Sequence, residues 1–270
     1  MRLAWLRRVH FDAVQTMRLG RSGLVISRLA LGTWRTWGNT LDYEAAERCL
    51  RTALEHGVNL VDVADVYAGG QAESWLGWMM ESLRRSDVVV STKFFWPTDA
   101  DDPNARGLSS KHLTEQLETS LRRLRTDYVD LLFCHRVDPR VPAEETVRTI
   151  GRMIDAGKVL YWGVSSADVA RIVELSRTAE ALGVPRPIAS QPRYNLLDRG
   201  IEDELLPTCR SLGMGQVVFS PLGQGRIVRE GTPAVDALRW CLKQPDVCAI
   251  FGASSPEQVL ANCAAGAPEP

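Results

Sequence analysis

From residue 24 onward, short runs of β-branched and apolar residues alternate with longer segments whose apolar residues recur every three or four positions. The short runs are typical of buried strands, and the longer segments are typical of helices that bury one face. The expected strands are residues 25–32, 59–65, 87–93, 129–135, 159–165, 187–191, 216–222 and 247–254. A helical segment follows each of them, and many of these segments stop at glycine, as helix ends often do.

Residues that favour helix starts precede several of the helical segments. Asp42 precedes the first one, Ser110 opens another, and Ser255 stands before Pro256 at the start of the last. Side chains of Asp and Ser accept hydrogen bonds from the free N–H groups of a helix start, and proline suits the first helical position. These signals support the alternating order of strands and helices.

This order predicts the fold. Strands that are almost entirely apolar and that each lead into a helix form a parallel sheet whose outer face is covered by helices. Eight such units in one chain predict an α/β protein with a closed (β/α)8 TIM barrel rather than an open doubly wound sheet. Residues 17–27 have the pattern of a glycine-turned β-hairpin, which we expect to plug the bottom of the barrel.

The domain organisation is simple. No linker or low-complexity segment divides the units, so we expect a single barrel domain over residues 17–266. Residues 1–16 contain three arginines and only short apolar pieces, which favours a disordered N-terminal extension over a signal peptide. The sequence lacks an apolar run of the ~18 residues that a membrane helix needs. We therefore expect a cytoplasmic protein.

The composition of the chain limits the classes of partner that we expect it to bind. Lys and Arg number 32 against 33 Asp and Glu, so the 270 residues carry a net charge of −1. Without a basic excess, we expect neither nucleic acid nor a membrane as partner. The six cysteines and four histidines show no metal-binding spacing, so we expect no metal site. The oligomeric state is left open.

Candidate chemistry lies where this fold places active sites, at the carboxyl ends of the strands. Asp62 and, one turn later, Tyr67 follow the second barrel strand, Lys93 ends the third and His135 ends the fourth. Each residue alone is typical of a structural role. Together they are typical of an acid catalyst: a Lys ammonium lowers the pKa of a Tyr hydroxyl, an Asp holds the Lys, and a His shares the proton.

The motifs around these residues resemble one family in sequence order. NLVDVADVYAGGQAESWLG, STKFFW and LLFCH resemble the aldo-keto reductases. GTWRTWGN, RGLSSKHL, VLYWGVS and GASSPEQVLAN are similar to the branch that contains voltage-gated potassium channel β-subunits and bacterial sugar reductases. The resemblance covers about residues 17–262 and implies the catalytic set Asp62, Tyr67, Lys93 and His135.

The resemblance also implies a role for each member of this set. Tyr67 would be the general acid and Lys93 its activator, with Asp62 as the anchor of Lys93. His135 would share the proton and orient the carbonyl group. Channel β-subunits tend to have Asn at this position, so His135 is more typical of an ordinary reductase.

A nicotinamide cofactor follows from the same resemblance: NADP(H), with NAD(H) left open. Ser165 and Gln191 would hold the carboxamide of the nicotinamide, and Phe219 would stack on its ring. The helix that starts near Ser255 adds a physical reason, because helix N-termini attract phosphate. The implied cofactor contacts are Gly32, Thr33, Trp34, Ser165, Gln191, Phe219, Ser220, Pro221, Leu222, Gly252, Ser254, Gln258 and Asn262.

Two departures from the family affect the cofactor and substrate sites. The loop after the seventh barrel strand and the C-terminal loop are both shortened, so residues that usually clamp the cofactor and line the pocket are absent. Aromatic residues elsewhere are candidates for the walls of an apolar pocket. They are Trp34, Trp37, Phe95, Trp96 and Trp162.

These observations predict an oxidoreductase that reduces a small-molecule aldehyde or ketone, with a keto-sugar as one option, to the alcohol. Hydride would come from NADP(H) and the proton from Tyr67. Two alternatives stay open. One is a channel-β-like subunit that senses redox state or binds a partner and turns over slowly, and the other is an aldolase that forms a Schiff base on Lys93.

Overall fold

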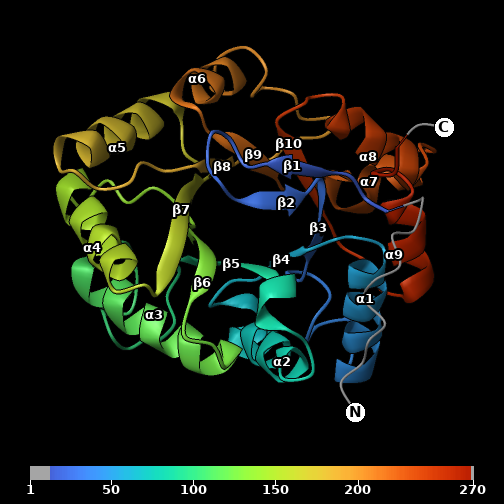
Figure 1. Ribbon diagram of the computed structural model, residues 1–270, viewed down its shortest axis with the longest axis horizontal. Helices are drawn as coiled ribbons and strands as arrows, with labels where there is room; N and C mark the ends of the chain where they lie inside the picture. Colours follow the sequence, from blue (N-terminus) through green and yellow to red (C-terminus); the bar gives the residue numbers. More distant parts are fainter. Residues whose placement is uncertain (1–12, 269–270) are drawn as a thin grey trace.

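The computed structural model of the protein describes residues 13–268, which form a closed barrel of parallel strands inside a ring of helices (Figure 1). The barrel strands are β3 (Leu29–Gly32), β4 (Leu60–Asp62), β5 (Val89–Phe94), β6 (Val129–Cys134), β7 (Val159–Ser165), β8 (Ala189–Gln191), β9 (Gly215–Val218) and β10 (Val247–Phe251). β10 pairs with β3 and closes the sheet, with Ile250 opposite Ala30. The predicted (β/α)8 barrel is confirmed.

Helices follow the strands along the chain. The α-helices are α1 (Tyr43–Glu55), α2 (Gln71–Met80), α3 (Ser110–Leu124), α4 (Ala143–Asp155), α5 (Val169–Ala181), α6 (Leu205–Leu212), α7 (Arg226–Arg229), α8 (Ala234–Leu242) and α9 (Pro256–Cys263). Short 3-10 helices are η1 (Tyr67–Gly70), η2 (Arg85–Asp87) and η3 (Gly223–Gly225). The short connection from β9 to α8 contains only η3 and α7.

Helix starts agree with the sequence at the three expected positions. Asp42 caps α1 through its side chain, and Ser255 caps α9 directly before the proline. The cap of α3 is Ser109, because its hydroxyl accepts a hydrogen bond from the His112 N–H at 3.2 Å. Ser110 is the first helical residue, so it opens this helix as expected.

The N-terminal hairpin closes one end of the barrel, as expected. β1 (Thr16–Arg18) and β2 (Val25–Ser27) are antiparallel, and they lie across the barrel in Figure 1. Leu19 and Ile26 are fully buried against the inward side chains of the barrel. The Arg21 N–H donates to the carbonyl of Gly213, just before β9 begins, at 2.8 Å. The hairpin thus covers the end at which the strands start.

The expected strand over residues 25–32 is two strands. Its first part belongs to the hairpin and its second part to the barrel, with Arg28 between them. The Arg28 N–H donates to Gln15 beside the hairpin, whereas its carbonyl accepts from Ala249 of β10. The chain therefore changes its pairing partner at this residue.

Described residues that precede Met17 form backbone hydrogen bonds with the barrel domain. Residues 1–12 of the expected extension lie outside the described residues. Val14 is buried, and its N–H donates to the His56 carbonyl at 2.9 Å. Gln15 donates to Gly266 at 2.8 Å. The expectation of disorder is therefore wrong for residues 13–16, because these backbone bonds join them to α1 and to the end of α9.

Strand side chains alternate between two apolar cores, since successive residues of a strand point to opposite faces. Outward residues such as Val61, Val90 and Leu132 pack against the helices. Inward residues fill the barrel: Leu19, Ile26, Ala30, Leu60, Val89, Leu131, Phe133, Ala189, Val217, Cys248 and Ile250. The next inward positions along the same strands must therefore form a further layer at the carboxyl ends.

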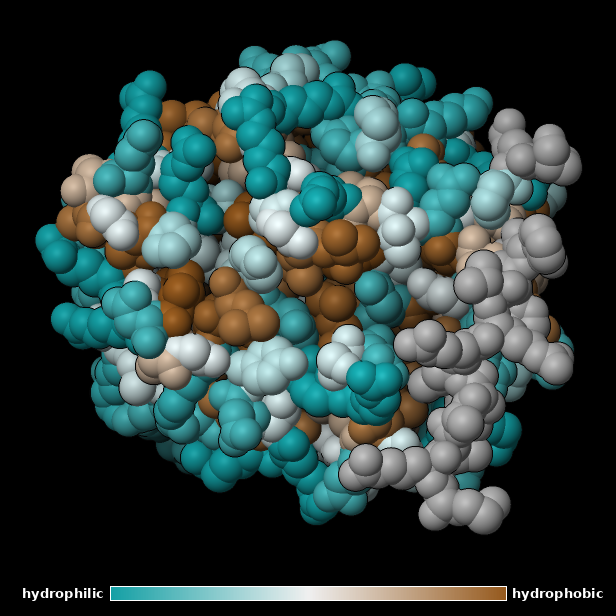
Figure 2. All heavy atoms as spheres, viewed as in Figure 1, coloured by the Kyte–Doolittle hydropathy of each residue, from teal (hydrophilic) through white to brown (hydrophobic). Residues whose placement is uncertain are grey.

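The surface on the hairpin side carries hydrophobic patches among hydrophilic side chains (Figure 2). Val25 of the hairpin and Leu160 near the start of β7 are 44% and 42% exposed. Scattered exposure of this kind is usual on protein surfaces. Among the described helices, none combines the length and the apolar character that crossing a membrane requires.

Candidate active site

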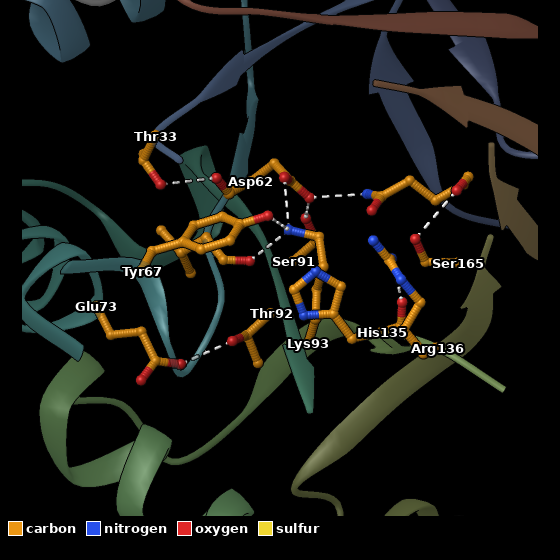
Figure 3. A network of polar contacts seen from close by, with 12 residues as sticks. Thr33, Asp62, Tyr67, Glu73, Ser91, Thr92, Lys93, His135, Arg136 and Ser165 are labelled. Atoms are coloured by element: carbon orange, nitrogen blue, oxygen red, sulfur yellow. Dashed lines mark hydrogen bonds and ion pairs between the residues drawn. The ribbon is translucent and has the colours of Figure 1, made fainter. Parts of the chain in front are cut away.

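The inward layer at the carboxyl ends of the strands is polar and buried (Figure 3). It lies directly above the apolar layer, since Asp62 and Lys93 are at even spacing from the inward residues Leu60 and Val89 of their own strands. The members of the layer are Asp62, Ser91, Lys93, His135, Ser165 and Gln191. The period of the strands therefore brings together residues that are far apart in sequence.

Lys93 is the centre of this layer. Its Nζ donates to Asp62 Oδ2 at 2.6 Å, to the Val63 carbonyl at 2.7 Å and to the Tyr67 hydroxyl at 2.9 Å. Burial opposes the charge of the ammonium, but Asp62 and Tyr67 outweigh this effect and raise the pKa of Lys93. A Schiff base requires a neutral amine with a free lone pair. This geometry argues against the aldolase alternative.

Asp62 is held from several sides. Its Oδ1 accepts hydrogen bonds from Ser91 Oγ at 2.8 Å and from Gln191 Nε2 at 2.9 Å, while Oδ2 faces Lys93. Ser165 Oγ donates to the Gln191 carbonyl at 3.1 Å. The two residues expected to hold a carboxamide are therefore adjacent, and Gln191 also braces the anchor of Lys93.

Tyr67 carries its proton at neutral pH. Burial raises the pKa of Tyr67, and the neighbouring Lys93 ammonium lowers it by a smaller amount, so that the net change is upward. The expected effect of Lys93 has the right sign, but the expected net lowering of the pKa is wrong. The reason is desolvation, which favours the neutral phenol. The phenol is thus available as a proton donor.

His135 is neutral. Burial, together with the positive charges of Lys93 and Arg136, lowers the pKa of His135 to about 2. Its ring centre lies 6.0 Å from that of Tyr67, with the rings nearly perpendicular. Among the described residues, its buried Nδ1 has no hydrogen-bond partner. The imidazole can form a neutral hydrogen bond to a bound carbonyl group, but it cannot serve as a charged acid.

The turn that presents Tyr67 is supported from α3. Arg123 donates to the Asp65 carbonyl at 3.0 Å and to the buried Glu73 carboxylate at 3.2 Å. Gly70 lies directly beneath this guanidinium and has a φ of 89°. A Cβ on Gly70 would stand 2.3 Å from Arg123 Cζ. Glycine is therefore required here both by the backbone conformation and by the close approach.

Gly70→Ala tests this support, with Gly69→Ala as its matched control. We expect Gly70→Ala to lower the free energy of unfolding by about 3 kcal/mol, because it adds backbone strain and displaces Arg123 from a buried carboxylate. Gly69 also has a positive φ, 63°, but a Cβ there has open space. Its alanine variant should lose only about 1 kcal/mol. Urea unfolding of both variants gives the comparison, and equal losses would contradict the role of Arg123.

A pocket of about 630 Å³ opens above the polar layer. It runs from Tyr67 and His135 past Phe219 to the N-terminus of α9. Fourteen of the residues expected to act in catalysis or cofactor binding line its wall: Gly32, Trp34, Asp62, Tyr67, His135, Ser165, Gln191, Phe219, Ser220, Pro221, Leu222, Gly252, Ser254 and Gln258. Lys93 lies just behind the wall, in contact with Tyr67.

Two expected cofactor contacts are not on this wall. The Thr33 hydroxyl is buried and donates to the Asp62 carbonyl at 3.0 Å, so it braces the strand end instead. Asn262 is buried on α9. The aromatic candidates fall into two groups. Trp34 and Trp96 line the pocket. The others, Trp37, Phe95 and Trp162, pack in the core or against it.

Several wall residues were not expected from the sequence. They include Arg35, Thr36, Thr40, Arg136 and Gln224. Arg35 Nη1 donates to Gln224 Oε1 at 2.9 Å and so links the loops after β3 and β9. Arg136 directly follows His135, and its position at a strand end was the one signal that could have identified it.

The far end of the pocket suits an elongated nucleotide. The turn after β9 has positive φ at Ser220 (53°) and Gln224 (57°), a conformation that often marks binding sites. At the start of α9, the Ser254 N–H and hydroxyl both donate to Gln258 Oε1. A Cβ on Gly252 would meet open space, so the wall leaves room here. Amide and hydroxyl groups at one end, an aromatic ring between, and a helix N-terminus at the other fit a nicotinamide dinucleotide.

The fold is a closed (β/α)8 barrel, and the site is a buried polar layer beneath a pocket at the carboxyl ends of its strands. The chain belongs to the aldo/keto reductase family, whose model matches residues 28–234. Relatives named as voltage-gated potassium channel β subunits are 46% identical in Oryza sativa subsp. japonica and 45% identical in Arabidopsis thaliana, in each case over 78% of this chain. A relative of the same name in Schizosaccharomyces pombe is 36% identical over 90% of this chain and 86% of its own length. The resemblance to this branch is confirmed.

The chain spans 65% of the length of the rice and Arabidopsis relatives, which is less than two thirds. The names of the rice and Arabidopsis proteins describe a channel assembly for those two proteins and not for this chain. The catalytic roles, the cofactor and the substrate of this chain are therefore the subject of proposals.

Proposed function

We propose that this chain reduces a small-molecule aldehyde or ketone to the alcohol with NADP(H), and that it also accepts NAD(H). The observation that carries the proposal is the buried contact of 2.9 Å between Lys93 Nζ and the Tyr67 hydroxyl, at the wall of the pocket. A bound nicotinamide dinucleotide supplies the hydride for this chemistry. As part of the same proposal, the protein acts in the cytoplasm.

Within this proposal, the protein residues handle the proton. Tyr67 donates its hydroxyl proton to the carbonyl oxygen, and Lys93 stabilises the phenolate that remains. Asp62 keeps the ammonium in place at 2.6 Å. His135 donates a hydrogen bond that orients the substrate oxygen, for which a neutral ring suffices.

Other wall residues would hold the cofactor. Ser165 and Gln191 would bind the carboxamide, and Phe219 would cover the nicotinamide ring. Ser254 and Gln258 would contact the phosphate or adenosine end, where the helix dipole favours negative charge.

A panel of aldehydes and ketones, assayed by oxidation of NADPH and of NADH, tests the proposal. We expect turnover with both nucleotides, with kcat/KM values within about tenfold of each other. The physical reason is that no wall residue between Gly252 and Gln258 is basic, so that little in the described chain selects for a 2′-phosphate. If neither nucleotide supported turnover of any compound in the panel, the proposed function would be contradicted. A preference for NADPH far above tenfold would contradict the argument about the wall.

The pH dependence of reduction is a separate prediction. The pKa of His135 is lowered to about 2, and the pKa of Tyr67 is raised from its usual value of 10.0. His135 is thus neutral and Tyr67 protonated throughout neutral pH. We expect kcat to be flat from pH 5.5 to pH 9 and to fall only as Tyr67 loses its proton at more alkaline pH. A step in kcat near the ordinary His value of 6.5 would show that His135 titrates.

The names of the relatives support a second candidate, a subunit that binds cofactor and a protein partner and turns over slowly. His135 favours the reductase, because channel β-subunits tend to have Asn at this position. The panel distinguishes the two. Multiple turnovers per second favour an enzyme, whereas tight cofactor binding with turnover slower than once a minute favours the partner subunit.

A further inference from the structure

Arg136 is a half-buried cation on the wall of the pocket. Its Cζ lies 5.3 Å from the centre of the Trp96 ring, where the ring face favours a cation. Nη1 donates to the His135 carbonyl at 2.7 Å and to the Ser166 hydroxyl at 3.1 Å. The guanidinium is thus fixed in position by groups that carry no charge, and within residues 13–268 it forms no ion pair.

The edge of the guanidinium that suits a carboxylate is free. The Nε–H and Nη2–H groups form a planar fork that matches the two oxygens of a carboxylate. Elsewhere in the described chain this edge holds carboxylates in the pairs Arg51–Glu47, Arg140–Asp138, Arg199–Glu202 and Arg210–Asp246. Arg136 is held through Nη1 instead, and no described residue bonds its Nε or Nη2.

The wall of the pocket has surplus positive charge. Asp62 is the carboxylate on the wall, and it is matched by Lys93 at 2.6 Å. Arg35 and Arg136 remain without a counter-charge among the described residues. Arg35 is exposed at the mouth and bonds the neutral Gln224 side chain. An anionic ligand would therefore complete the charge balance of the pocket.

Arg136 adjoins the place where a substrate would react. The His135 ring centre lies 6.0 Å from that of Tyr67 and 6.2 Å from that of Trp96, and Arg136 covers Trp96 in turn. A substrate whose carbonyl group meets Tyr67 and His135 would have the indole and the guanidinium as its next neighbours. The loops that would hold the cofactor phosphates follow β9 and β10, whereas Arg136 follows β6.

We propose that Arg136 binds a carboxylate of the substrate, so that this site reduces an oxo acid whose apolar body lies against Trp96. The inference rests on the proposed function, because it names the substrate class of that reaction. Hydride from the nicotinamide reaches the carbonyl carbon, the Tyr67 proton reaches the carbonyl oxygen, and the carboxylate itself is unchanged. The anion is recognised in the substrate and product alike.

Two probes of matched shape test this. 4-Carboxybenzaldehyde and methyl 4-formylbenzoate share the ring and the aldehyde but differ in charge. We expect wild-type protein to favour the acid in kcat/KM by roughly 10- to 100-fold, mainly through KM, since the fork binds ground state and transition state alike. Arg136→Met should bring the ratio of the two kcat/KM values close to one. Arg136→Lys, which keeps the charge without the fork, should give an intermediate ratio.

Arg35→Met is the matched control. It removes the same charge from the same pocket, so any loss of acid preference that it causes measures general attraction. We expect it to retain most of the preference. An equal loss in Arg35→Met and Arg136→Met would overturn the proposal, as would a wild-type ratio near one. Either result would leave the reductase proposal intact, because turnover of the ester reports on it separately.

Calorimetric titration of both probes in the presence of NADP⁺ gives a readout that does not depend on turnover. Tighter binding of the acid than of the ester, lost in Arg136→Met, would support the carboxylate site even if neither probe were reduced. In that case it is the reductase proposal that would fail. If Arg136→Met instead weakened NADP⁺ binding and left the ratio of the probes unchanged, Arg136 would serve the cofactor and the proposal would be overturned.

Discussion

Tyr67→Phe is expected to lower the turnover of carbonyl substrates by about 10²–10⁴-fold, the usual contribution of a general acid. The variant keeps the ring that packs near Trp34 and His135, at centre distances of 6.5 Å and 6.0 Å. It loses only the hydroxyl that contacts Lys93 at 2.9 Å. Affinity for the cofactor should therefore change little.

The measurement combines steady-state kcat with a cofactor titration followed by nicotinamide fluorescence. Tyr43→Phe is the control, since Tyr43 packs against Trp75 and Trp78 and is not on the wall of the pocket. Its turnover should equal that of the wild type. If the Tyr67 variant reduced carbonyls at the wild-type rate, the proton would have to come from another group and the proposed acid would be wrong.

The barrel was predictable because its signals are local and repeated. Each strand has an apolar run and each helix an amphipathic face, so that errors in one element leave the count of units intact. The errors that occurred lie at junctions. Arg28 divides one expected strand, and residues 13–16 are ordered where disorder was expected, because both depend on backbone partners from distant segments.

Much of the candidate site was also predictable, for a geometric reason. Four of its residues lie at strand ends, at positions whose side chains point into the barrel: Asp62, Lys93, Ser165 and Gln191. Because side chains of a strand alternate between its two faces, these four form one layer. Loop residues follow no such period. The directions of Arg35, Arg136 and Thr33 depend on how their loops fold, and no periodic pattern in the sequence shows which of them faces the pocket.

The protonation states could not be predicted from residue types. Lys93 beside Tyr67 suggested a lowered pKa for the phenol, but the extent of burial decides the net direction. The same holds for His135, whose neutral state follows from desolvation and from two neighbouring cations. Burial is a property of the packed barrel, and residue types alone do not define it.

Asp62→Asn is expected to lower the free energy of unfolding by about 3–5 kcal/mol at pH 7, the usual cost of removing one partner of a buried ion pair. The variant leaves the Lys93 ammonium, which is 1% exposed, without its counter-charge. Turnover should fall together with stability, because the ammonium is no longer held at Tyr67. Ser91→Ala is the matched control: it removes one neutral hydrogen bond to the same carboxylate and should cost about 1 kcal/mol.

The pH dependence of this deficit separates a charge effect from a packing effect. In the wild type, Asp62 helps to raise the pKa of Lys93, so the pair stabilises the fold below the ordinary Lys value of 10.5 and loses this effect as pH rises through the raised pKa. In Asp62→Asn, burial without a partner would lower the pKa of Lys93. The unfolded variant would then bind more protons than the folded one, and its stability would rise with pH. Urea unfolding at pH 7 and pH 9.5 should therefore show a shrinking deficit for Asp62→Asn and a constant one for Ser91→Ala. A deficit for Asp62→Asn that is the same at both pH values would mean that Lys93 does not depend on Asp62 for its charge.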